Sequence, residues 1–175
     1  GPTFVKIGQL LSTRPDLLPR DIIAELSRLQ DNVPAVAYED VCAIVQNELG
    51  QRIEDIFCDF DKEPLAAASI GQVHRACLNN GEEVVVKVRR PNIISRMKTD
   101  LEILHWLARE IHERISDMHP YDLPGVVQTL RKSLLRETDF TIEANNSKIF
   151  ANSNPYEDVV FSPEVIDEFT SERLL

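Results

Sequence analysis

A single lysine inside a run of valines is the first residue whose position suggests chemistry. Lys87 follows Val84–Val86 and precedes Val88, and this β-branched run predicts a strand. Because strand side chains alternate between two faces, the lysine must point away from the face that its valine neighbours bury. Such a lysine either reaches solvent as an ordinary surface residue or serves as a fixed cation for nucleotide phosphates.

A run of small residues upstream is the second candidate. Ala66, Ala67, Ala68 and Ser69 come directly before Ile70-Gly71, at the first turn of a predicted sheet. Small side chains let the main chain approach a ligand closely, although alanine permits less approach than glycine does. An alanine run is also what ordinary packing produces, so this turn alone does not define a site.

Three carboxylates within one later segment form the third candidate. Glu137, Asp139 and Glu143 lie in the stretch 136–146. If this stretch is helical, Asp139 and Glu143 are four residues apart and share a face, while Glu137 is turned away. Grouped carboxylates can hold a lysine or coordinate Mg²⁺, and a solvated acidic face is the plainer alternative.

Composition narrows the classes of partner. The 175 residues carry a net charge of −10, from 19 Lys and Arg against 29 Asp and Glu. We expect no nucleic-acid partner, because the only dense basic cluster, Lys87, Arg89 and Arg90, is short and ends the valine run. The cysteines at 42, 58 and 77 are odd in number and have no metal-ligand spacing, so they predict neither a disulfide framework nor a zinc site.

Periodicity predicts an α+β chain with a small antiparallel sheet of about five strands. Apolar spacing predicts helices at 21–30, 38–49, 91–115 and 125–150, with a helical turn near 53–57. Strands are predicted at 64–70, 72–78 and 84–88, joined by the turn Asn79-Asn80-Gly81, and again at 159–165 and 169–175. Alternation within the second strand predicts that His74 faces solvent.

The order of these features carries more weight than any one of them. The chain has a small-residue turn, then a valine-rich strand with an embedded lysine, and later an acidic helix. The amino-terminal half of a kinase nucleotide site has the same order. The chain closely resembles the UbiB/ADCK atypical kinase-like family, which is linked to coenzyme Q and other prenylquinones. The matching segments are Lys6-Ile7-Gly8-Gln9 (the Lys-x-Gly-Gln motif), 12–19, Ala66–Ser69, Lys87, Glu137-Thr138-Asp139 (the Glu-x-Asp motif) and Glu143.

The resemblance implies a role for each matching residue. Lys87 would hold the nucleotide phosphates and pair with Glu143, while Ala66–Ser69 would cover the nucleotide in place of a glycine loop. Lys6 and Gln9 would reach over the active site, near Glu137 and Asp139, and block a protein substrate. The implied cofactors are ATP or ADP with Mg²⁺, and no metal ligands are expected in this segment itself.

The resemblance also implies a domain organisation and a place in the cell. Residues 1–58 would form a helical Lys-x-Gly-Gln extension, and 59–175 a kinase-like N-lobe with a helical insertion at about 91–120. The chain is expected to stop near the hinge, before the catalytic Asp, its Asn and the metal-binding Asp, and so to be inactive alone. The whole protein would be an intracellular kinase or ATPase peripheral to a membrane, in bacteria, mitochondria or plastids; a nucleotide-gated scaffold is the alternative. Its partners would be its own C-lobe and membrane lipid or quinone-biosynthesis proteins.

Overall fold

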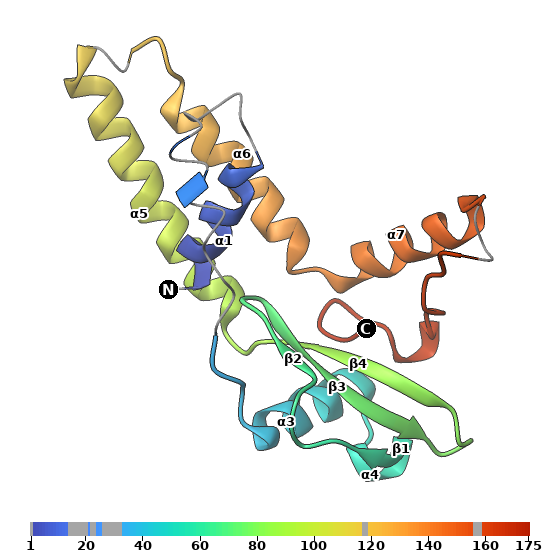
Figure 1. Cartoon of the computed structure of the whole chain (residues 1–175). Helices are drawn as coiled ribbons and strands as arrows, with labels where there is room; N and C mark the ends of the chain where they lie inside the picture. Colours follow the sequence, from blue (N-terminus) through green and yellow to red (C-terminus); the bar gives the residue numbers. More distant parts are fainter. Residues whose placement is uncertain (1, 14–20, 22–23, 26–32, 117–118, 156–158) are drawn as a thin grey trace. The chain divides into compact units, whose positions relative to one another are not determined.

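The computed structural model describes residues 2–13, 21, 24–25, 33–116, 119–155 and 159–175. The chain forms two compact units, each built from segments that are distant in the sequence (Figure 1). One unit contains residues 1–33 and 92–136, and the other contains 34–91 and 137–175. The predicted helix at 21–30 lies largely outside the described residues, and the predicted domain boundary at residue 58 stays a prediction.

The first unit is helical. It contains α1 (Pro2–Ser12), α5 (Ile93–Arg114) and nearly all of α6 (Leu123–Glu137), and α1 packs against α5. The predicted apolar seam of the long helix is present, since Met97, Leu101 and Ala108 are buried at helical spacing. None of the helices in the described residues is both long enough and apolar enough to cross a membrane.

The second unit is built on an antiparallel sheet of four short strands, β1 (Phe57–Phe60), β2 (Ala66–Ala67), β3 (Gly71–Leu78) and β4 (Glu83–Arg89). β4 pairs with β3 from Gly71 to Cys77, and β1 and β2 also pair with β3. Val73 and Ala76 of β3 each pair with β4 on one side and with β2 or β1 on the other. β1 and β2 therefore lie along the same edge of β3, opposite β4. The predicted strands at 72–78 and 84–88 are present as β3 and β4, whereas the strand predicted at 64–70 is reduced to β2, and β1 was not predicted.

A hydrophobic core covers one face of this sheet. The helix α3 (Tyr38–Leu49), whose bounds match the predicted helix, and the short α4 (Ile53–Ile56) pack their apolar side chains against it. From the strands the core takes inward side chains such as Ala76, Leu78, Val86 and Val88. Alternation then leaves the opposite, outer face of β3 and β4 to Val73, Arg75, Val85 and Lys87.

The region after residue 125 differs from the prediction in two ways. The single helix predicted at 125–150 is two helices, α6 and α7 (Phe140–Ser153), because the chain breaks at Thr138 and Asp139. The strands predicted at 159–165 and 169–175 do not form: this stretch contains a 3₁₀ turn, η2 (Asp167–Phe169), and a single bridge between Leu174 and Val88. Pro163 lacks the N–H that a sheet ladder needs. The α+β class is confirmed, with four strands in the described residues instead of about five.

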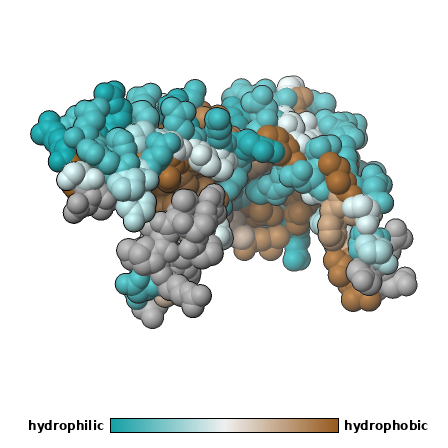
Figure 2. Space-filling view, turned by 90° about the horizontal axis from the view of Figure 1, so that it is seen from above, coloured by the Kyte–Doolittle hydropathy of each residue, from teal (hydrophilic) through white to brown (hydrophobic). Residues whose placement is uncertain are grey.

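The face seen in Figure 2 is mostly hydrophilic, with apolar side chains gathered in patches. Large exposed apolar residues come from two places in particular. On α5 they are Ile103, Trp106 and Leu107, and near the carboxyl end they are Val159, Val160 and Phe161.

Candidate functional site

Lys87 lies where the strand pattern predicts. Val86 and Val88, its neighbours, are buried in the core, so the Lys87 side chain leaves from the outer face of β4. Its Nζ donates to both carboxylate oxygens of Glu143, at 2.6 Å each. The pair is partly exposed, with 30% of the Lys87 side chain and 47% of the Glu143 side chain accessible. The two residues are 56 positions apart, so the fold brings them together.

The break between α6 and α7 determines how Glu143 is presented. Asp139 is the N-cap of α7, and its side chain accepts a hydrogen bond from the Thr141 N–H at 3.0 Å. Glu143 follows in the first turn, where the positive end of the helix dipole favours a carboxylate. The predicted helical face shared by Asp139 and Glu143 is therefore wrong, because Asp139 caps the helix. Glu137 ends the preceding helix.

Two further residues complete the surroundings of Lys87 and were not among the predicted site residues. The Phe140 ring is buried, and the Lys87 Nζ lies 4.8 Å from its centroid, within the range of a cation–π contact. Gly71 makes room for this ring, since a Cβ there would lie 3.1 Å from Phe140 Cζ and 2.7 Å from the Val88 carbonyl oxygen. The signal available in the sequence was the glycine that ends the small-residue turn.

The predicted small-residue turn is present between β2 and β3. Ala66 and Ala67 form β2, and the Ala68 N–H donates to the Gly71 carbonyl at 2.8 Å across the turn. Ser69 is buried, whereas Ala66 and Ala68 are exposed. The structure thus places a compact hairpin turn at the start of the strand that pairs with β4, and its role as a nucleotide cover stays a prediction.

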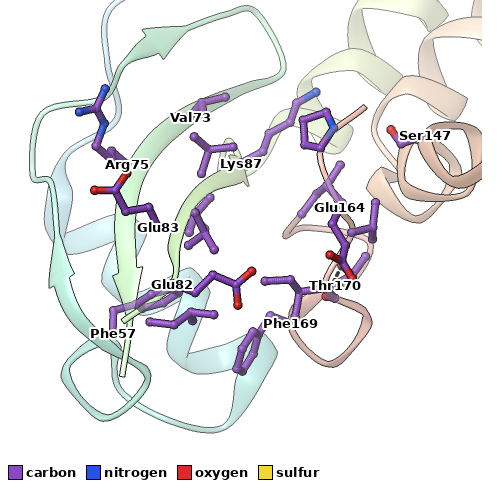
Figure 3. A pocket seen from close by; sticks show the side chains of 18 of the residues that line it. Phe57, Val73, Arg75, Glu82, Glu83, Lys87, Ser147, Glu164, Phe169 and Thr170 are labelled. Atoms are coloured by element: carbon purple, nitrogen blue, oxygen red, sulfur yellow. Dashed lines mark hydrogen bonds between the residues drawn. The ribbon is translucent and has the colours of Figure 1, made fainter. Parts of the chain in front are cut away.

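A cavity of about 810 Å³ adjoins the Lys87–Glu143 pair, and all its lining residues belong to the second unit. Val73, Arg75 and Lys87 line it from the sheet, while Ser147 and Phe169 belong to the facing wall (Figure 3). Its volume lies within the range of cavities that take small molecules. The cavity therefore combines an apolar wall with a cation that is held in place.

Lys6 and Gln9 lie in α1, in the other compact unit. Their predicted approach to Glu137 and Asp139 stays a prediction. The described residues contain no group of three or more His, Cys, Asp or Glu side chains that could hold a metal ion.

A buried polar network in the second unit was also missed. The prediction that His74 faces solvent is wrong, because the side chain is fully buried. Its Nδ1 lies 2.8 Å from the Asp61 carbonyl, between β1 and β2, and its Nε2 lies 2.9 Å from the Gln72 amide nitrogen. Gln72 in turn accepts from the Val36 N–H at 2.7 Å and donates to the Val36 carbonyl at 3.3 Å. The network fastens residues 36 and 61 to β3.

Two cysteines that are distant in the sequence meet on adjacent strands. Cys58 lies at an irregularity in the β1–β3 register, beside Cys77. Both thiols donate to the Leu78 carbonyl, at 3.2 Å and 3.5 Å. A hydrogen bond from Cys58, followed by burial and by nearby negative charges, raises the pKa of the Cys77 thiol from 9.0 to about 11.

An antiparallel sheet whose strand lysine is paired with a helix glutamate defines the class of the chain: it is a lobe of the kinase-like type. The model of the ABC1 atypical kinase-like domain matches residues 28–175, and the chain belongs to that family. The predicted UbiB/ADCK relationship is thereby confirmed.

Individual relatives agree with this assignment. The chain is 40% identical over 178 residues to "Probable protein kinase UbiB" of Cellvibrio japonicus, covering 100% of this chain and 32% of that protein. It is 43% identical over 177 residues to "Protein ACTIVITY OF BC1 COMPLEX KINASE 8, chloroplastic" of Arabidopsis thaliana, covering 100% of this chain and 23% of that protein. The chain therefore spans only a third or less of the length of these relatives.

A solved structure has the same fold. The complex of Rv3197 with erythromycin from Mycobacterium tuberculosis matches with a TM-score of 0.66 at 27% identity, covering 96% of this chain and 42% of that one.

Proposed function

We propose that this chain is the nucleotide-binding lobe of an atypical kinase or ATPase. The observation that carries the proposal is the Lys87–Glu143 pair, in which both carboxylate oxygens hold the ammonium at 2.6 Å. A lysine held in one position offers a fixed charge to phosphate oxygens, which is what phosphoryl transfer requires of its surroundings. The ammonium keeps a third N–H that Glu143 does not need.

The apolar part of the cavity suits the base of a nucleotide. Val85 is 52% exposed although it is a large apolar residue, and it lies on the same sheet face as Lys87. Val73 pairs with Lys87 across the strands and is half-buried. An apolar shelf beside a fixed cation would accept a flat base with its phosphates directed toward Lys87.

ATP or ADP fits these residues, and Mg²⁺ would accompany its phosphates. From the resemblance we propose that the protein ligands of that ion belong mainly to the C-lobe of the whole protein. In the whole protein we propose a role in ubiquinone or other prenylquinone metabolism at a membrane surface, supported by the resemblance of the motifs and by a relative named UbiB. Partners there would be lipid or quinone-biosynthesis proteins.

Nucleotide binding by the intact protein, titrated with a fluorescent ADP or ATP analogue, tests the proposal. Lys87→Met is expected to weaken binding roughly tenfold or more, because a charged hydrogen bond to phosphate is lost. Lys98→Met on α5 is the matched control, since Lys98 is an exposed lysine of the other unit. Equal affinities for the wild type and Lys87→Met would refute the proposed site.

Phosphate release separates an enzyme from a nucleotide-gated scaffold, the second candidate. The intact protein is expected to release phosphate from ATP in a Lys87-dependent way, whereas a scaffold would bind nucleotide without release. The 175-residue chain alone is expected to release none, because its sequence contains no catalytic-loop Asp with its Asn. Release by the chain alone that disappears in Lys87→Ala would overturn that expectation.

A further inference from the structure

Arg89 ends the strand that carries Lys87, Arg90 comes directly after it, and neither behaves as an ordinary surface residue. Both guanidinium groups donate hydrogen bonds to main-chain carbonyls. Arg89 Nη1 donates to the Thr138 carbonyl at 2.6 Å and to the Glu172 carbonyl at 3.2 Å. Arg90 reaches different targets, donating to the Ala68 and Pro34 carbonyls at 2.8 Å each.

The targets of Arg89 lie at the joint where α7 begins. Thr138 directly precedes Asp139, the N-cap of that helix. The Glu172 carbonyl also accepts from the Phe140 N–H at 3.2 Å, so Arg89 and the start of α7 share an acceptor. Arg89 thereby joins β4 to Thr138 and to the Glu172 carbonyl, and that carbonyl in turn holds the first residue of α7.

Glu143 lies only three residues beyond Phe140, within the first turn of α7. A helix is stiff over so short a distance, so the position of its first residue determines where Glu143 lies. The Phe140 ring is buried beneath Gly71 and lies 4.8 Å from the Lys87 Nζ. A shift of the joint would therefore move both groups that contact Lys87.

Burying the charge of Arg89 at this joint costs free energy. Arg89 is only 8% exposed, and burial, followed by repulsion from Arg173, lowers the pKa of its guanidinium. Its hydrogen bonds to Thr138 and Glu172 go to neutral carbonyls, and attraction to the nearby carboxylates of Glu172, Glu48 and Asp139 compensates the buried charge only in part. A buried cation directed at two main-chain carbonyls fixes the geometry of the segments that carry them.

We propose that Arg89 is a positioning residue of the nucleotide site: it anchors the start of α7 and so holds Glu143 against Lys87. The inference rests on the proposed function only for its effect on binding. The anchoring itself is a property of the fold and can be measured without nucleotide. Arg90 provides the matched control, because it is the same residue type at the next position and fastens the small-residue turn instead.

The first experiment is hydrogen exchange of the intact protein without nucleotide. Arg89→Leu is expected to speed exchange in the peptide covering 140–153 roughly tenfold, since a buried charged hydrogen bond is lost. Arg90→Leu is expected to speed exchange at 66–70 and to leave 140–153 unchanged. Unchanged exchange of α7 in Arg89→Leu would overturn the anchoring. If Arg89→Leu does not fold, Arg89→Gln is used for the same test, because glutamine keeps an N–H donor but lacks the charged, forked guanidinium group.

The second experiment is a double-mutant cycle on nucleotide affinity. If Arg89 acts through Glu143, the double variant of Arg89→Leu and Glu143→Gln binds nucleotide no more weakly than Glu143→Gln alone. Losses that multiply would overturn the positioning role, as would full affinity in Arg89→Leu. Absence of nucleotide binding by the wild type would refute the proposed function, and the exchange experiment would then decide the anchoring by itself.

Discussion

Replacing Gly71 with alanine tests the packing that brings the sheet, α7 and Lys87 together. The new methyl would lie 2.7 Å from the Val88 carbonyl oxygen and 3.1 Å from the Phe140 ring. The carbonyl belongs to the paired strand β4, which cannot move without straining the ladder. One of the two strands must therefore shift, and the ring must also give way by a few tenths of an ångström.

The expected cost can be estimated from similar changes. Adding a methyl group to a close-packed site destabilises by about 1–3 kcal/mol, and the reduced freedom of the unfolded chain returns about 0.4–1 kcal/mol. A net loss of about 1–2 kcal/mol would lower the melting temperature of a chain of this length by roughly 2–8 °C. Because the ring beneath Lys87 is displaced as well, nucleotide affinity should fall with stability.

Thermal unfolding of the 175-residue chain followed by circular dichroism measures the first effect, and nucleotide titration of the intact protein measures the second. Gly81→Ala is the control: its φ of +88° also makes alanine unfavourable, but a Cβ there meets no atom within 4 Å. It should lower stability without changing nucleotide affinity. An unchanged or raised melting temperature in Gly71→Ala would refute the close approach of Gly71, Val88 and Phe140.

Two further predictions concern groups outside the immediate site. Gln72→Leu removes both hydrogen bonds to Val36 and should lower the free energy of unfolding, measured by chemical denaturation, by about 1–3 kcal/mol. The same change at the exposed Gln128 is the control and should lower it little. Equal losses in the two variants would contradict the role of the network. The Cys77 thiol, with a pKa of about 11, should be alkylated slowly at pH 8 to 9, and Cys58→Ala should move its alkylation midpoint down towards 9. Since the folded pKa lies above the ordinary value, this thiol's contribution to stability is present below pH 9 and declines as the pH rises through about 11. An alkylation midpoint that Cys58→Ala does not change would contradict the contact between the two thiols.

Local patterns predicted the elements that depend mainly on nearby residues. The helix at 38–49 has the predicted bounds, because its apolar spacing and the left-handed Gly50 after it are local signals. The valine run with its lysine also formed the predicted strand, with Lys87 on the outer face. The likeness of several motifs then predicted the pairing of Lys87 with Glu143, which spacing alone could not specify.

Other features that depend on tertiary contacts were missed. No proline or glycine marks the break between α6 and α7; Arg89 on the Thr138 carbonyl and the Asp139 cap stabilise it. Asp139 before Thr141 was the available capping signal. Strand alternation alone predicts that His74 points outward. In the structure the chain is interrupted between β1 and β2, and the Asp61 carbonyl there is the buried partner of the His74 ring.

The central claim is that Lys87 meets nucleotide phosphates, and affinity labelling tests it most directly. An acyl-phosphate derivative of ATP transfers its acyl group to a lysine amine beside the phosphates, forming an amide as the phosphate leaves. Mass spectrometry of the labelled intact protein should find the label on Lys87, and excess free ADP or ATP should prevent it. Labelling that spares Lys87, or that free nucleotide does not reduce there, would contradict the account.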